Sequence, residues 1–111
     1  MTRRLIVSPE AEAQIDAIDT WWRSNRVASP DLFAQELAEA FATIEAAAEA
    51  GHRYPHPDVK GVRRVPLRTT RNHVYYVDAG EVVAILAVWG AIKKTGPDLS
   101  RISDEQFHNA A

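Results

Sequence analysis

Residues 63–99 read RRVPLRTTRNHVYYVDAGEVVAILAVWGAIKKTGPDL, and this stretch decides the fold. It holds three β-rich runs, at residues 64–67, 73–78 and 82–89. The last run is almost entirely Val, Ile, Leu and Ala, which is typical of a strand buried on both faces. Residues 78–81 (DAGE) separate the second and third runs and predict a short hairpin turn, with Gly80 at a position that needs a positive φ.

Cationic and aromatic side chains gather around these runs, so we expect a functional surface here. The residues of this kind are Arg63, Arg64, Arg68, Arg71, His73, Tyr75, Tyr76, Trp89, Lys93 and Lys94. Alternation along the second run places His73, Tyr75 and Val77 on one face of the strand and the residues between them on the other. At most one of the two adjacent tyrosines can therefore contact a ligand, and the other belongs to the core.

The chain is 111 residues long, which predicts one domain over residues 1–99, followed by a tail or short helix at residues 100–111. It has no cysteine, which excludes disulfides and thiolate metal sites. No apolar run approaches the ~20 residues that span a bilayer. Because the apolar part of the N-terminus is also too short for a secretory signal, we expect a cytoplasmic protein without a membrane partner.

The net charge of −2 hides an asymmetry along the chain. Residues 1–58 carry ten acidic and five basic residues, whereas residues 59–101 carry three acidic and eight basic residues. Helices that collect Glu for solubility would produce such a division. A local basic excess on so short a segment also favours an anionic or acidic partner.

Two helices are expected ahead of the β-rich stretch, after a short strand at residues 3–7. Ser8-Pro9-Glu10 predicts the first helix start, and an apolar stripe from Ala11 to Trp22 gives it one buried face. Ser29-Pro30-Asp31 repeats that start signal. The second helix has a stripe formed by Phe33, Leu37, Phe41, Ile44 and Ala48, a solvent-facing side formed by Glu36, Glu39, Glu45 and Glu49, and a stop at Gly51.

The expected order is therefore β-α-α-β-β-β, with residues 52–61 as a loop. A helical hairpin cannot bury its two apolar stripes alone, so it must pack on one face of the sheet. The fold class is α+β, with a helical hairpin on a small, mainly antiparallel sheet.

Three parts of the sequence, in this order, resemble the RelE/ParE superfamily of toxins from bacterial type II toxin–antitoxin systems, the group known as plasmid stabilisation proteins. The parts are residues 7–22 (VSPEAEAQIDAIDTWW), residues 54–65 (YPHPDVKGVRRV) and residues 73–97 (HVYYV onward to GP). The resemblance implies a RelE/ParE-like fold and a small growth-inhibiting toxin that is neutralised by a cognate antitoxin. It also implies a heterotetramer or a larger toxin–antitoxin complex.

Two activities occur on this fold: RelE-like members cut mRNA on the ribosome, and ParE-like members poison DNA gyrase. Arg68 matches a basic position of the RelE-like branch, and His73 stands where that branch carries a functional Arg. Ala91 and Ile92 occupy positions where a basic residue is expected, and residues 95–99 (TGPDL) lack the late Tyr or His. These departures favour the ParE-like branch, which binds its target and needs no catalytic residues.

The first hypothesis is thus a ParE-like, non-catalytic gyrase inhibitor without a cofactor or metal. The residues expected to bind the target or the antitoxin are Arg63, Arg64, Arg68, Arg71, Tyr75, Trp21, Trp89, Lys93 and Lys94. The second hypothesis is a ribosome-dependent mRNA endonuclease with Arg68, Arg71, His73, Lys93 and Lys94 as its catalytic candidates. A third is an inactive family member that serves as a binding module.

Overall fold

The computed structural model describes residues 3–91 and 96–99; the expected tail at residues 100–111 and Lys93 and Lys94 lie outside this part. The helical half comprises strand β1 (Arg4–Val7), helix α1 (Pro9–Asn25), helix α2 (Leu32–Ala46) and a 3₁₀ turn at Ala48–Ala50. The sheet is completed by β2 (His52–Arg53), β3 (Val62–Leu67), β4 (Asn72–Asp78) and β5 (Val82–Gly90).

The five strands form one sheet in the order β1-β5-β4-β3-β2. β1 pairs with β5 in parallel, and the other three pairings are antiparallel. The predicted α+β class and the order of the long elements are confirmed. β2 was not predicted, because two residues are too few to show an alternating pattern.

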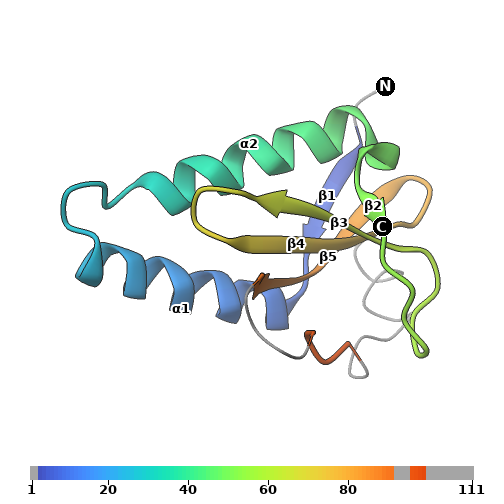
Figure 1. Ribbon diagram of the computed structural model, residues 1–111. Coiled ribbons are helices and arrows are strands. Elements are labelled where there is room, and N and C mark those ends of the chain that lie inside the picture. Colours follow the sequence, from blue (N-terminus) through green and yellow to red (C-terminus); the bar gives the residue numbers. More distant parts are fainter. Residues whose placement is uncertain (1–2, 92–95, 100–111) are drawn as a thin grey trace.

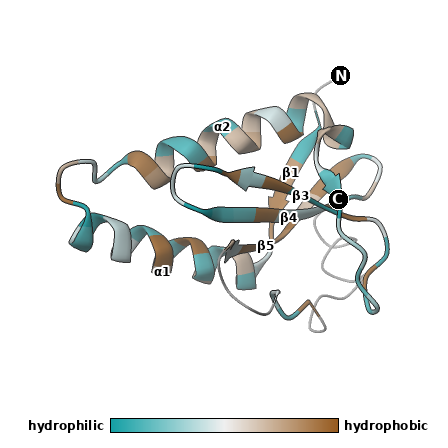
Figure 2. Ribbon diagram, in the orientation of Figure 1, coloured by the Kyte–Doolittle hydropathy of each residue, from teal (hydrophilic) through white to brown (hydrophobic). Residues whose placement is uncertain are grey.

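The two helices lie antiparallel over one face of the sheet, with apolar residues turned toward it (Figures 1 and 2). Phe33 and Ile44 of α2 are fully buried against Val74, Tyr76 and Val88 of the sheet. Ile15, Ile18 and Trp22 of α1 pack on the same core. The predicted stripes therefore form the main core. A smaller core on the opposite face contains Val62, Tyr75, Leu86 and Leu99.

The two helix-start signals behave differently. Ser8 caps α1 as predicted, because its Oγ accepts a hydrogen bond from the Ala11 amide at 3.1 Å. The prediction that Ser29 caps α2 is wrong: α2 begins at Leu32, and the Ser29 carbonyl accepts a bond from Trp22 Nε1 at 2.8 Å. The predicted stop at Gly51 is also late, since α2 ends at Ala46.

Tyr76 joins β4 to the segment that follows α2. Its ring is fully buried, its hydroxyl donates to the Ala48 carbonyl at 2.7 Å, and it accepts from the Gly51 amide at 2.8 Å. Gly51 has no side chain because a Cβ there would lie 2.5 Å from the Tyr76 hydroxyl and 3.0 Å from the Arg64 carbonyl oxygen. The Tyr76 hydroxyl thus ties β4 to the 3₁₀ turn and to the residue that precedes β2.

Replacing Tyr76 by Phe should destabilise the fold by about 1–3 kcal/mol, because the Gly51 amide and the Ala48 carbonyl lose a buried partner. Urea denaturation measures the change. Gly51→Ala should also be costly, and part of that cost should vanish in the Tyr76→Phe background, because the clashing hydroxyl is gone. Strictly additive costs would contradict this account of the contact.

Candidate functional site

Residues 68–71, which connect β3 to β4, are called the hairpin tip below. Arg68 and Arg71 are exposed, and neither guanidinium has a hydrogen-bond or ion-pair partner within residues 3–91 and 96–99. Together with His73 they line a shallow groove of about 340 Å³. The structure therefore brings together three of the sequence-predicted site residues.

The carboxylate of Glu36, on α2, holds the hairpin tip. Its Oε2 accepts a hydrogen bond from the Thr69 amide at 2.8 Å, and its Oε1 accepts from the Thr70 amide at 3.0 Å and the Thr70 hydroxyl at 2.6 Å. Partial burial disfavours the charged form, but the bonds from Thr70 and Thr69 outweigh it and lower the pKa of Glu36 below its ordinary 4.5.

Residues at the start of β4 and just after β5 attach the tip a second time. Asn72 is buried, and its Nδ2 donates to both the carbonyl and the hydroxyl of Thr70, each at 3.2 Å. The Ala91 amide, just after β5, donates to the Arg71 carbonyl at 2.8 Å. The backbone between these contacts adopts the left-handed region at Arg71, with a φ of 61°.

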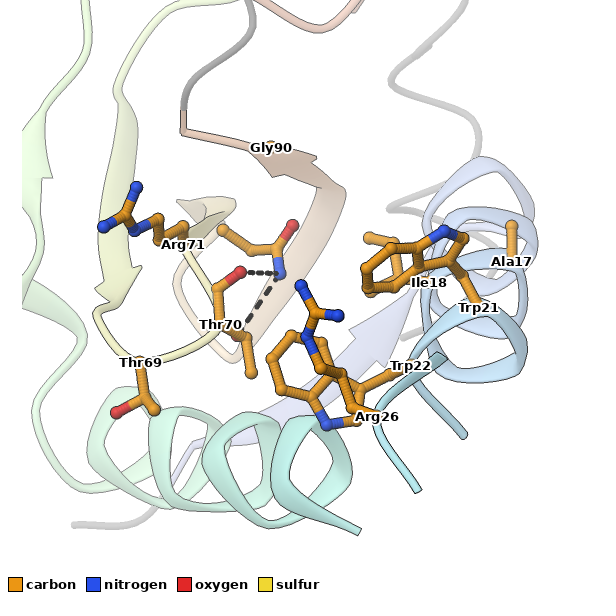
Figure 3. A pocket seen from close by; sticks show the side chains of 10 residues that line it. Ala17, Ile18, Trp21, Trp22, Arg26, Thr69, Thr70, Arg71 and Gly90 are labelled. Atoms are coloured by element: carbon orange, nitrogen blue, oxygen red, sulfur yellow. Dashed lines mark hydrogen bonds between the residues drawn. The ribbon is translucent and has the colours of Figure 1, made fainter. Parts of the chain in front are cut away.

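A groove of about 740 Å³, the α1 groove, separates the hairpin tip from the C-terminal end of α1. Figure 3 shows the Trp21 and Trp22 rings projecting from α1 with the Arg26 side chain between them. The Arg26 guanidinium carbon lies 5.2 Å from the Trp21 ring centre and 5.9 Å from the Trp22 ring centre, within cation–π range. Trp21 is 49% exposed, so the groove presents an open aromatic surface beside a cation.

The sheet face opposite the helices carries a second group of predicted site residues. The Arg64 guanidinium lies 5.0 Å from the Tyr54 ring centre, and Tyr54 in turn packs edge-on against Tyr75 at 4.9 Å. Burial and then the positive charge of Arg64 lower the pKa of His73, so its imidazole is neutral near pH 7. Burial raises the pKa of Tyr75, whose ring is only 2% exposed. Tyr75 therefore offers a partner almost no accessible surface.

The remaining predicted residues are distributed over the sheet. Arg63 and Arg64 are neighbours in sequence but lie on opposite faces, and Arg63 donates to the Gly51 carbonyl at 2.9 Å. Trp89 is half-buried opposite His73 in the β4–β5 pairing. The predicted binding residues therefore do not form one continuous cluster; the hairpin tip and the α1 groove are where exposed ones meet.

Two functional candidates were missed by the sequence reasoning. Arg26 is not among the expected binding residues, and Glu36 is expected on the solvent-facing side of α2. The second expectation is wrong, because Glu36 is half-buried against the tip. A signal existed: Glu36 is three residues after Phe33 and directly before Leu37, so it borders the buried stripe.

A search of the described residues finds no group of three or more His, Cys, Asp or Glu side chains arranged to hold a metal ion. None of the described helices is long and apolar enough to cross a membrane. The lining of the two grooves includes cationic, aromatic and hydroxyl side chains, which suit the binding of an anionic or apolar partner.

Comparisons with known proteins agree with this architecture. The family model described as "ParE toxin of type II toxin-antitoxin system, parDE" matches residues 5–91. A solved structure entitled "Chromosomal ParDE TA system from P. aeruginosa" is similar in fold, with a TM-score of 0.63 and 22% sequence identity over 80% of this chain and 96% of that one. A comparison with curated proteins finds no match.

Two helices packed on a five-stranded, mainly antiparallel sheet are the α+β architecture of the RelE/ParE fold. Because the family model extends over most of the chain, the protein belongs to the ParE toxin family of type II toxin–antitoxin systems.

The lowered pKa of Glu36 predicts a pH-dependent contribution to stability. The unfolded chain takes up the proton first as the pH falls, so this contribution is complete above pH 4.5 and is lost as the pH falls through the folded-state pKa. The stability difference between wild type and Glu36→Gln should therefore be constant near neutrality and should shrink as the pH falls below 4.5.

Urea denaturation across this pH range tests the prediction, with Glu39→Gln as the control. Glu39 is an exposed residue on the same helix, so its substitution should give a small difference at every pH. A Glu36→Gln difference that persists unchanged at low pH would contradict the assignment.

Proposed function

We propose that this protein is the toxin of a type II toxin–antitoxin pair, inhibits DNA gyrase by binding it, and is neutralised by a cognate antitoxin in the cytoplasm. The observation that carries the proposal is the ParE family match, which spans both helices and nearly the whole sheet. On this proposal the protein binds rather than catalyses, needs no cofactor, and assembles with its antitoxin as a heterotetramer or larger complex.

The α1 groove is the surface that best suits the antitoxin. None of its described lining residues is acidic, and Arg26 and Arg71 lie at its margins beside the exposed Trp21 ring. A partner segment with an apolar anchor between carboxylates would fill the groove and pair with these cations. We therefore propose an acidic, amphipathic antitoxin segment as its occupant.

A specific observation favours the RelE-like activity as a second candidate. Arg68, Arg71 and His73 line one groove, and the lowered pKa of His73 leaves its ring neutral and able to accept a proton at pH 7. Two cations beside a neutral base would suit cleavage of an RNA phosphodiester. Lys93 and Lys94 remain candidates of this hypothesis.

Expression of the protein alone should arrest bacterial growth, and co-expression of the small reading frame beside its gene should relieve the arrest. Purified protein should inhibit supercoiling by gyrase and cause gyrase–DNA cleavage complexes to accumulate, while messages in arrested cells stay intact in primer extension. Discrete message cleavage that is abolished by Arg68→Ala or His73→Ala would instead support the endonuclease. Normal growth with retained antitoxin binding would identify an inactive binding module.

Trp21→Ala and Arg26→Ala should each weaken antitoxin binding by about tenfold or more, because exposed aromatic and Arg anchors carry much of the energy of an interface. Their effect on unfolding free energy should stay within about 1 kcal/mol, since both side chains are exposed. Calorimetric titration gives the affinities.

Val27→Ala is the matched control. Val27 is 79% exposed, and it is not among the residues that line the groove. Its substitution should leave antitoxin binding unchanged. Wild-type affinity in both the Trp21 and Arg26 variants would place the antitoxin elsewhere.

A further inference from the structure

We propose that Glu36 is a positioning residue that holds the hairpin tip in an anion-binding conformation, in which Arg68 and Arg71 face the carboxylates of an acidic partner segment. This inference deepens the proposed function, because it assigns a role to a residue that contacts no partner itself. Three features of the tip support it. Both carboxylate oxygens of Glu36 accept hydrogen bonds, the backbone at Arg71 has a positive φ, and neither arginine has an internal partner among the described residues.

The first feature is the way in which Glu36 is used. Both of its oxygens accept hydrogen bonds from the tip, and all three donors belong to Thr69 and Thr70. Glutamine cannot reproduce this arrangement. In either orientation of its amide, the NH₂ group would face a backbone N–H, so one donor would oppose another. The contact therefore requires a carboxylate.

The second feature is the backbone of Arg71. A φ of 61° is uncommon for residues other than Gly, Asn and Asp, and it costs about 1–2 kcal/mol for an ordinary L-residue. The surrounding contacts must hold it there, and these are the Glu36 bonds on one side and the Ala91 amide on the other. An arginine at a position where Gly would be unstrained is consistent with a role for its side chain.

The third feature is the absence of an internal partner for either guanidinium within the described residues. Glu36 is the carboxylate bonded to the tip, yet its hydrogen bonds go to N–H and O–H groups rather than to Arg68 or Arg71. Because the Glu36 carboxylate is bonded to Thr69 and Thr70, it forms no ion pair with Arg68 or Arg71. Both guanidinium groups are therefore available to an external anion.

The charge around the tip favours an acidic protein segment over a nucleic acid. The helical segments carry Glu39 and Glu45 on α2, Glu49 on the 3₁₀ turn, and Glu12, Asp16 and Asp19 on α1, and the whole chain has a net charge of −2. A nucleic acid needs a run of phosphate contacts along a basic surface, whereas the tip offers two exposed arginines. A short acidic segment needs only the two arginines.

The test is an NMR titration of the full-length protein with a hexaglutamate peptide at low salt. In the wild type, the peptide should shift the Nε–Hε signals of Arg68 and Arg71 and the amide signals of the tip. Glu36→Gln should weaken this binding by about threefold to tenfold, the scale of one lost hydrogen bond. The direction of the change in peptide affinity is decisive, because removing a nearby negative charge would otherwise strengthen the binding of an anion.

Glu39→Gln is the matched control, since it removes one negative charge from the same helix without touching the tip. It should leave peptide binding equal to wild type or slightly tighter. Thr70→Ser keeps the hydroxyl that donates to Glu36 and should retain binding, whereas Thr70→Val should follow Glu36→Gln. These two variants separate positioning from a general loss of stability, which urea denaturation records in parallel.

Equal or tighter peptide binding by Glu36→Gln would overturn the inference, as would a wild type whose tip does not respond. Binding of a single-stranded oligonucleotide at the tip without binding of hexaglutamate would overturn the choice of ligand. If the wild type binds the peptide at the tip but does not arrest growth, the toxin proposal fails and the positioning role of Glu36 stands.

Discussion

The burial of β5 on both faces constrains the arrangement of the rest of the chain. Residues 82–88 are all buried, and six of them divide between the two cores: Val83, Ile85 and Val88 pack toward the helices, and Ala84, Leu86 and Ala87 pack on the opposite face. A strand of this kind cannot lie at an edge of the sheet. β1 and β4 therefore flank it, and the helical hairpin must cover one face while the loop bearing Tyr54 and the segment ending at Leu99 cover part of the other.

Hydrophobic burial of this kind explains the centre of the molecule but not the hairpin tip. Of residues 68–71 only Thr70 is buried, and the tip is held by polar contacts to Glu36, Asn72 and Ala91. Hydrogen bonds fix direction and spacing more strictly than apolar contacts do, and they leave the arginine side chains outside. The apolar core thus stabilises the fold as a whole, and a network of hydrogen bonds sets the conformation of the hairpin tip.

The sequence predicted the elements whose burial is periodic. The stripes through Phe33 and Ile44, the opposite directions of Tyr75 and Tyr76, and the continuous burial of β5 all follow from spacing alone, because each residue's side is set by helical or strand geometry. β2 and the start of α2 could not be predicted in this way. They depend on tertiary contacts, such as the Tyr76 hydroxyl at Gly51 and the Trp22 indole at the Ser29 carbonyl.

The candidate site was less predictable for the same physical reason. Residue type identified Arg68, Arg71 and Trp21, but spacing cannot show that α2 and the tip meet 33 residues apart in sequence. Glu36 looked like a solvated helix residue because two of its three donors are backbone amides, which no sequence pattern marks. The separation of Arg63 from Arg64 follows from strand alternation and could have been anticipated. Consecutive residues of a regular strand point to opposite faces, so adjacent charges on a strand do not gather on one surface. At the β3–β4 turn the backbone leaves the strand conformation, and Arg68 and Arg71 line one groove there.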